Sequence, residues 1–209
     1  MDVIERIKET KIVPVVKLED AAKAVDLADA LAAGGICCAE VTFRTAAAAD
    51  AIAAIACARP GFFVGAGTVV NTEQAKRALD AGAQFLVSPG FSEKLAAFCA
   101  DNGAVFLPGV CTSTEVMAAM EFGLDHLKFF PAEAMGGLKT IKALAGPFVG
   151  VKFMPTGGIN VSNVRSYLES PFIYACGGSW MVPGAKVKEN DWAGITALTR
   201  EASDLVADL

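Results

Sequence analysis

Apolar runs rich in β-branched residues alternate with helix-forming, often alanine-rich segments along the whole chain. Each apolar run spans about five to seven residues, and about ten to fourteen residues of helical character follow it after a turn. The runs that we interpret as strands are Ile12–Val16, Cys37–Phe43, Phe62–Val69, Phe85–Ser88, Val105–Pro108, His126–Phe130, Val151–Pro155 and Ile173–Cys176. The helices that we predict between and after them are Asp20–Ala33, Ala46–Ala58, Thr72–Ala81, Ser92–Asn102, Ser113–Phe122, Leu138–Leu144, Ser162–Leu168 and Asp191–Val206, and a short helix over Asp2–Glu9 precedes the first strand.

Local signals mark the ends of these helices. Asn71 is placed to cap one helix, with Gln74 three residues on, and Thr112 with Glu115 forms a capping-box pattern before another. Glycines stand where several helices should stop, namely Gly34, Gly82, Gly103 and Gly123. Eight strand–helix units without a long linker predict one domain over residues 1–209, an α/β (β/α)₈ TIM barrel with a short N-terminal helix. A doubly wound open sheet is the alternative, but it rarely contains eight such regular units.

A barrel places its chemistry at the C-terminal ends of the strands, on side chains that point inward. In the sixth predicted strand, Lys128 stands among Leu127, Phe129 and Phe130. Removing an ammonium group from water disfavours its charged form. Lys128 therefore either reaches the surface or pairs with a carboxylate, or it is held partly neutral so that its amine attacks a carbonyl. Lys152, the rival amine, begins the seventh strand and should lie near the opposite face of the barrel, where a paired or snorkelling lysine is ordinary.

The second predicted strand places three polar residues on one face. Because side chains alternate along a strand, Glu40, Thr42 and Arg44 share a face, whereas Val41 and Phe43 suit packing against helices. The polar side chains would then point into the barrel and its mouth. A buried glutamate has two explanations, a structural ion pair with Arg44 or a lysine, or a role in proton transfer.

Other strand ends carry weaker signals. Thr68 shares a face with Val64 and Ala66 and either caps the strand locally or faces a ligand. The sequences Ser88-Pro-Gly90 and Pro108-Gly-Val110 are typical of tight turns that shape the mouth. Lys17 follows the first strand and either holds an anion or stays a solvated loop residue.

Two Gly-Gly sequences follow the seventh and eighth strands, in Thr156-Gly-Gly-Ile-Asn160 and Gly177-Gly-Ser-Trp180. Glycines let the backbone approach an anion closely, and the N–H groups can point at it. A helix that begins after such a loop adds partial positive charge. Barrels commonly bind phosphate with these two loops, so the pair predicts a phosphate site.

Charge and composition argue against several classes of function. The net charge is −5 and there is no basic run, so we expect neither nucleic acid nor a membrane as a partner. The N-terminus lacks the apolar core of a signal peptide, and no run reaches the roughly 18 apolar residues of a membrane helix, so we expect a cytoplasmic protein. The six cysteines have no C-x-x-C spacing and are interpreted as small hydrophobes in a reduced compartment. His126, the only histidine, is interpreted as structural, and no metal site is predicted.

Seven segments, taken in order, resemble the family of class I aldolases that act on 2-keto-3-deoxy-6-phosphogluconate (KDPG) and 4-hydroxy-2-oxoglutarate (KHG). They are Glu40-Val-Thr-Phe-Arg-Thr45, Gly65-Ala-Gly-Thr-Val69, Ser88-Pro-Gly90, Pro108-Gly-Val110, Lys128-Phe-Phe-Pro-Ala-Glu133, Pro155-Thr-Gly-Gly-Ile159 and Gly177-Gly-Ser-Trp180. The resemblance runs from about Ile12 to the last helix. It implies a homotrimeric, metal-independent lyase without a cofactor. Such an enzyme forms a Schiff base and cleaves KDPG to pyruvate and glyceraldehyde 3-phosphate, with KHG as a further substrate that yields pyruvate and glyoxylate.

The resemblance also implies roles for individual residues. Lys128 would be the Schiff-base lysine and Glu40 the general acid and base, while the pyruvate carboxylate would lie near Arg44 and Thr68. Lys17 matches less closely, because some relatives carry an arginine there, and a lysine lacks its bidentate fork. The full set of implied substrate-binding residues is Lys17, Arg44, Thr68, Pro89, Phe130, Thr156, Gly157, Gly158, Gly178 and Ser179, and the phosphate would lie on the last four.

Other functions remain open at this point. One alternative is an aldolase for the galactonate epimer of KDPG. Another is a phosphate-binding barrel of a different class, either a sugar-phosphate epimerase or a transferase like thiamine-phosphate synthase. An epimerase would need paired acidic residues, usually with a metal, and the transferase would need Mg²⁺ ligands at the strand ends; neither set is visible in the sequence. A barrel that binds a metabolite without catalysis would have no need for a buried lysine beside a glutamate.

Overall fold

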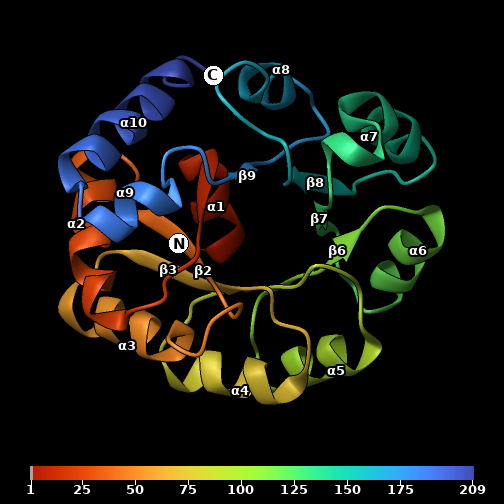
Figure 1. The fold of residues 1–209 in the computed structure, drawn as a ribbon. Coiled ribbons are helices and arrows are strands. Elements are labelled where there is room, and N and C mark those ends of the chain that lie inside the picture. Colours follow the sequence, from red (N-terminus) through yellow and green to blue (C-terminus); the bar gives the residue numbers. More distant parts are fainter. Residues whose placement is uncertain (1) are drawn as a thin grey trace.

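The computed structural model describes residues 2–209 and shows a ring of helices around a parallel β-barrel (Figure 1). The strands are β1 (Ile12–Val16), β2 (Cys38–Thr42), β3 (Phe63–Gly67), β4 (Leu86–Val87), β5 (Phe106–Leu107), β6 (Gly109–Val110), β7 (His126–Phe129), β8 (Lys152–Pro155) and β9 (Cys176–Gly178). The α-helices are α1 (Val3–Thr10), α2 (Ala24–Ala33), α3 (Ala48–Ala58), α4 (Thr72–Asp80), α5 (Glu93–Asp101), α6 (Ser113–Glu121), α7 (Gly137–Ala145), α8 (Val164–Leu168), α9 (Gly184–Glu189) and α10 (Trp192–Leu205). Two 3₁₀ helices, η1 (Ala21–Lys23) and η2 (Glu133–Met135), complete the list. The predicted α/β TIM barrel is confirmed.

The barrel wall consists of two sheets that meet at two junctions. One sheet has the order β5-β4-β3-β2-β1-β9 and the other β6-β7-β8. Between β8 and β9, parallel bridges pair Phe153 with Ile173 and Thr156 with Gly177. At the other junction the chain passes through Pro108, which has no N–H to donate. The segment before it pairs with β4 and the segment after it pairs with β7, so one continuous wall strand is divided into β5 and β6.

Two predictions about the strands were wrong. Pro108-Gly-Val110 is not a tight turn, because Gly109 and Val110 form β6 and pair with β7. The eighth strand ends later than predicted, since β9 contains both Gly177 and Gly178, which are buried and paired with β1. Pairing with β1 extends the strand to Gly178. This position inside the barrel wall needs glycine, because a Cβ atom on Gly178 would lie 1.9 Å from the ring of Trp180.

The helix signals in the sequence correspond to observed caps. The Asn71 side chain accepts the N–H of Gln74 at the start of α4, and Thr112 with Glu115 forms a complete capping box at α6. Glycines just past α4, α5 and α6 adopt positive φ angles, as expected for helix ends. Helices η2 and α9 were not predicted, because elements this short show no hydrophobic period.

Polar side chains inside the fold gather at one end of the barrel. Within residues 2–209, seven polar or charged residues are buried, and five of these lie on β2 or β7 or directly after β4 or β8, namely Glu40, Thr42, Ser88, Lys128 and Thr156. Burying a polar group without a partner is costly. Their concentration near the C-terminal strand ends therefore indicates where a functional site lies.

The packing of β3 generates a test of the barrel itself. A Cβ atom on Gly65 would lie 2.3 Å from the ring of Phe85, which packs on Phe63 with ring centres 4.9 Å apart. We expect Gly65→Ala to lower the free energy of unfolding by about 1–3 kcal/mol, because the methyl group must displace a close-packed ring. Urea-induced unfolding measures the change. Gly61→Ala is the matched control, since its added methyl meets nothing within 4 Å; equal stability of both variants would contradict this account.

Candidate active site

Lys128 and Glu40 meet inside the barrel. The Lys128 Nζ atom lies 3.3 Å from Glu40 Oε1, and the two side chains are 6% and 0% exposed. They come from β7 and β2, which are not neighbours in either sheet, so the pair spans the interior. Removing both charges from water carries a large penalty, which their mutual attraction offsets in part. Lys128 Nζ also lies 5.4 Å from the centre of the Phe130 ring, so an aromatic face borders the amine.

Glu40 has one oxygen without a partner. Its Oε1 atom faces Lys128, whereas Oε2 is buried and forms no hydrogen bond within residues 2–209. Gly67 makes the space for this carboxylate, because a Cβ atom there would lie 2.0 Å from Oε1. Sequence reasoning missed that role, although a glycine inside a strand is a known sign of close approach by another group. The unpartnered oxygen suits proton exchange with a bound molecule.

Arg44 is held at the mouth by the residue two positions before it. The Thr42 hydroxyl donates to the carbonyl of Val16 at 2.8 Å and accepts the Arg44 Nε–H at 3.1 Å. The two terminal guanidinium nitrogens of Arg44 form no hydrogen bond within the described residues, and the side chain is exposed. A guanidinium anchored through Nε presents its fork to an anion, and this geometry matches a carboxylate.

A cavity of about 500 Å³ opens beside this arginine, among the segments after β1, β2 and β9. Val15 lines it and pairs in register with Glu40, although the Lys128–Glu40 pair is not itself part of the lining. Lys17 also lines it; this lysine is exposed and forms a 2.6 Å ion pair with Glu19, a type of contact that contributes little. The lining combines cationic, acidic, polar and apolar groups, among them Lys17, Lys23, Arg44, Glu19, Asp20, Ser179, Val15 and Val182.

The loop after β8 presents backbone donors. Gly157 and Gly158 have φ angles of 101° and 82°, a left-handed conformation that favours glycine. The N–H groups of Gly158 and Ile159 donate to no protein acceptor within residues 2–209. Thr156, which begins the loop, is buried and its hydroxyl has no partner there either. Successive free N–H groups of this kind form a concave site for an anion.

Thr68 lies directly after β3 in a left-handed conformation, with φ of 53°. The register of β2 with β3 places Gly65 and Gly67 opposite Glu40 and Thr42. If the alternation of side chains continued past β3, Thr68 would point away from the face that carries Glu40 and Thr42. The left-handed backbone at Thr68 interrupts this alternation. Such a conformation is strained for a threonine, and strained residues cluster at functional sites.

The remaining predicted residues lie at the same end of the barrel. Pro89 is exposed in the turn after β4, where the Ser88 hydroxyl donates to the Gly90 carbonyl at 2.5 Å. Ser179 is exposed directly after β9. Gly178 is the last residue of β9 and directly precedes Ser179, and its contact with the phosphate stays a prediction.

Lys152, the rival amine, and His126 lie at the opposite end of the barrel, where the strands begin. Lys152 begins β8, pairs in register with His126 and donates to the carbonyl of Pro171 at 2.6 Å. His126 Nδ1 lies 2.6 Å from Asp125 Oδ1 and its ring packs edge-on against Tyr174. The three buried cysteines do not offer an alternative nucleophile, because burial raises the pKa of Cys99 to about 11 and raises the pKa of Cys38 and Cys176 further.

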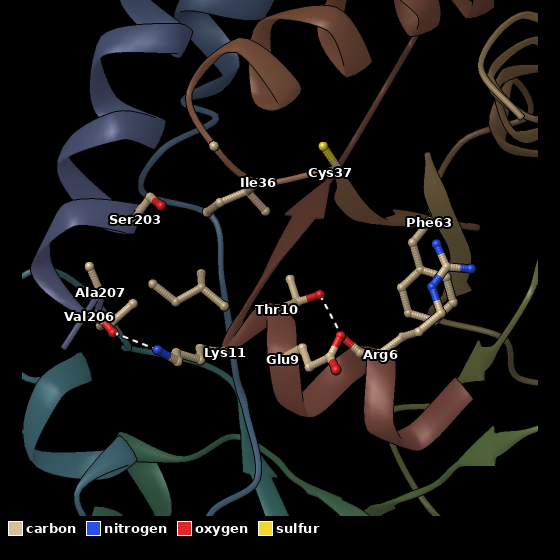
Figure 2. A pocket seen from close by; sticks show the side chains of 12 residues that line it. Arg6, Glu9, Thr10, Lys11, Ile36, Cys37, Phe63, Ser203, Val206 and Ala207 are labelled. Carbon is tan, nitrogen blue, oxygen red and sulfur yellow. Dashed lines mark hydrogen bonds between the residues drawn. The ribbon is translucent and has the colours of Figure 1, made fainter. Parts of the chain in front are cut away.

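A second cavity, of about 310 Å³, lies among α1, the start of β2 and the end of α10 (Figure 2). Its two cationic side chains are already engaged. Lys11 Nζ donates to the carbonyl of Val206 at 2.9 Å, while Arg6 donates to Gln84 at 2.8 Å and stacks over Phe63. This cavity is on the face where the strands begin, and barrel enzymes place their chemistry at the opposite face. It is therefore not the candidate active site.

Comparisons with known proteins identify the family of the chain. Residues 3–198 match the family model for KDPG and KHG aldolases. A 2-dehydro-3-deoxy-phosphogluconate aldolase of Treponema pallidum is 47% identical over 204 residues, which cover 98% of this chain and 97% of that protein. The structure is similar to that of a KDPG aldolase from Legionella pneumophila, with pyruvate captured as a covalent carbinolamine intermediate, at a TM-score of 0.92 and 38% identity over 95% of this chain and 97% of that one.

A second solved structure, the KDPG aldolase of Zymomonas mobilis with 3-phosphoglycerate, has a TM-score of 0.90 and 44% identity over 96% of this chain and 95% of that one. The identities and coverage are too high for a likeness of fold alone. The resemblance seen in seven separate segments of the sequence thus extends over nearly the whole chain. The chain belongs to the KDPG and KHG aldolase family.

Proposed function

We propose that this protein is a class I aldolase that cleaves KDPG to pyruvate and glyceraldehyde 3-phosphate, and that it also cleaves KHG to pyruvate and glyoxylate. The observation that carries the proposal is the buried Lys128–Glu40 pair at the centre of a barrel of this family. The covalent pyruvate intermediate of the Legionella relative supports the same chemistry, since a carbinolamine forms between an amine and a ketone. The galactonate epimer of KDPG is the alternative substrate.

The first half of the reaction uses the short path between the two side chains. Glu40 takes a proton from the Lys128 ammonium, and the neutral amine attacks the C2 ketone of the substrate. The carbinolamine then loses water, with Glu40 returning a proton to the departing oxygen, and an iminium remains. Because Glu40 Oε2 has no partner within the described residues, it is available for these transfers directly or through a water molecule.

The second half breaks the C3–C4 bond. The base removes the proton of the C4 hydroxyl, the aldehyde forms, and the electron pair of the C3–C4 bond moves into the iminium to give an enamine. Glyceraldehyde 3-phosphate leaves. Glu40 then returns the proton to C3, and water hydrolyses the iminium to release pyruvate and regenerate the Lys128 amine. The proton taken at C4 is the one delivered to C3, so the cycle is balanced.

Substrate binding divides between the two ends of the ligand. We assign the pyruvate carboxylate to the guanidinium of Arg44 and the hydroxyl of Thr68, and the phosphate to the N–H groups of the loop after β8 and to Ser179. The free donors of Gly158 and Ile159 support the phosphate assignment. Lys17 is a supplementary cation in the cavity that it shares with Ser179 and Arg44. The other implied contacts, Pro89, Phe130, Thr156 and Gly157, lie around the same mouth.

A covalent trap tests the nucleophile. Incubation with pyruvate and borohydride, followed by peptide mapping, should give an adduct on Lys128 in the unaltered protein, because borohydride reduces the iminium to a stable amine. Lys128→Met should abolish both adduct and turnover, whereas Lys152→Met should keep both. Lys128→Met leaves Glu40 buried without its partner, which costs about 3–5 kcal/mol of stability. Circular dichroism must therefore show that this variant is folded. An adduct on Lys152, or none at all, would remove the proposal.

The phosphate assignment predicts a selective loss. Ser179→Ala should raise KM for KDPG about 10-fold, because a hydrogen bond to a charged group is lost, and should leave KM for KHG unchanged, because KHG has no phosphate. Gly158→Ala should act in the same direction, since its Cβ atom would lie 2.5 Å from the Glu133 side chain. Steady-state kinetics on both substrates measure the effect. Equal losses on the two substrates would count against the assignment.

We further propose that the protein is a homotrimer in the cytoplasm. Three large apolar side chains on or directly after α6 support a protein–protein interface: Met117, Met120 and Phe122 are 58%, 42% and 37% exposed. The cysteines, all free, suit a reducing compartment. Within residues 2–209, no helix has the length and apolar character needed to span a bilayer.

Sedimentation equilibrium tests the trimer. Met117→Lys combined with Met120→Lys should shift the protein from a trimer to a monomer, because two charges would be buried in an apolar interface. Val149→Lys is the matched control, since Val149 is 93% exposed and lies outside this group of residues. A trimer that survives the double substitution would place the interface elsewhere, and a monomeric unaltered protein would remove the proposal.

A further inference from the structure

The loop that carries the free N–H donors, residues 156–160, is fixed by groups outside it. The carbonyl oxygens of its two glycines accept hydrogen bonds from the protein. The Gly157 carbonyl accepts the backbone N–H of Glu133 at 3.0 Å, and the Gly158 carbonyl accepts the side-chain amides of Asn160 and Asn163, both at 3.0 Å. The loop is therefore held on one side by donors from η2, from its own end and from the start of α8.

These bonds determine where the free donors point. In a trans peptide the C=O and N–H of one unit point in opposite directions. The carbonyl of Gly157 shares its peptide unit with the N–H of Gly158, and the carbonyl of Gly158 shares its unit with the N–H of Ile159. Holding the two carbonyls against Glu133, Asn160 and Asn163 thus aims both N–H groups away from them. The orientation of the anion site depends on the groups behind it.

Glu133 acts at three points of this arrangement. Its backbone N–H binds Gly157, its side chain packs against Gly158 so closely that a Cβ atom there would meet Glu133 Cγ at 2.5 Å, and its carboxylate accepts the hydroxyl of Tyr167. Tyr167 is 2% exposed and lies in α8, the helix that follows the loop. Burial, together with the charge and hydrogen bond of Glu133, raises the pKa of Tyr167, so the hydroxyl keeps its proton and donates.

The Tyr167 bond also has an electrostatic consequence. A carboxylate beside a phosphate site repels the ligand unless it is held away from it. The hydroxyl of Tyr167 holds the Glu133 carboxylate against α8, and a Cβ atom on Gly137 would lie only 2.8 Å from that hydroxyl, so the space is closely packed. A glutamate in this position is therefore compatible with phosphate binding because of its tyrosine partner.

We propose that Glu133 and Tyr167 are positioning residues that set the selectivity of this enzyme for phosphorylated substrates. Neither residue touches the reacting atoms. Together they hold the peptide units of Gly157 and Gly158 so that the N–H groups face the phosphate, and they hold the Glu133 carboxylate away from it. The inference rests on the proposed aldolase function and on the loop as its phosphate site.

Steady-state kinetics on KDPG and KHG test this proposal. Tyr167→Phe should raise KM for KDPG about 5- to 10-fold, with kcat within about two-fold and KM for KHG unchanged. Glu133→Ala should raise KM for KDPG by less than Tyr167→Phe does, because this variant loses the packing against Gly158 but also removes the carboxylate that would repel the phosphate. Glu133→Gln should stay within about two-fold of the unaltered enzyme, since the amide oxygen still accepts the Tyr167 hydroxyl and the side chain keeps its shape.

Tyr174→Phe is the matched control for loss of a tyrosine hydroxyl. Tyr174 is the only other tyrosine, and its buried hydroxyl has no partner within residues 2–209, so its removal should leave the KM ratio of the two substrates unchanged. Losses of kcat on both substrates in Tyr167→Phe would indicate a merely structural role and overturn the inference, as would an unchanged KM for KDPG. If the unaltered enzyme cleaves neither substrate, the proposed function itself fails, and this outcome is distinct from failure of the inference.

Discussion

A buried ion pair is the constraint on which the rest of this structure depends. Lys128 and Glu40 come from opposite sides of the barrel and meet in an interior that is otherwise mostly apolar. Two charged groups are tolerated there because each lies beside the opposite charge of the other. The residues around them follow from this requirement: Gly67 leaves space for the carboxylate, and the ring of Phe130 borders the amine. In the proposed mechanism the pair also places the proton that Lys128 must lose next to the carboxylate that accepts it.

Close backbone approach is the second organising feature of the site. At several positions of the barrel wall the residue is glycine, because another group fills the space that a side chain would take. Gly67 makes way for Glu40, Gly177 for the hydroxyl of Thr156, and Gly178 for the ring of Trp180. These glycines lie inside strands, where glycine is normally unfavourable. Their presence in the wall is explained by what stands against them.

The mouth separates into two kinds of recognition. Arg44, anchored through Thr42, offers a side-chain fork, whereas the loop after β8 offers backbone N–H groups whose direction is fixed by Glu133, Asn160 and Asn163. A fork suits the planar carboxylate of a keto acid, and a set of N–H groups suits a tetrahedral phosphate. One barrel end therefore offers a place for each end of the phosphorylated keto acid proposed as substrate, and the proposed mechanism places its ketone at the Lys128 amine.

The sequence by itself determined the alternation of strands and helices, the barrel class, the helix caps at Asn71 and Thr112, and the two residues of the central pair, because these depend on local periodicity and on the rarity of charges in apolar strands. The family resemblance then suggested the role that is proposed for each site residue. Only the tertiary structure decided that the wall strand continues past Pro108, that Gly177 and Gly178 belong to β9, and that Glu133 reaches Tyr167. Those features arise from contacts between segments far apart in the chain, which no local pattern encodes.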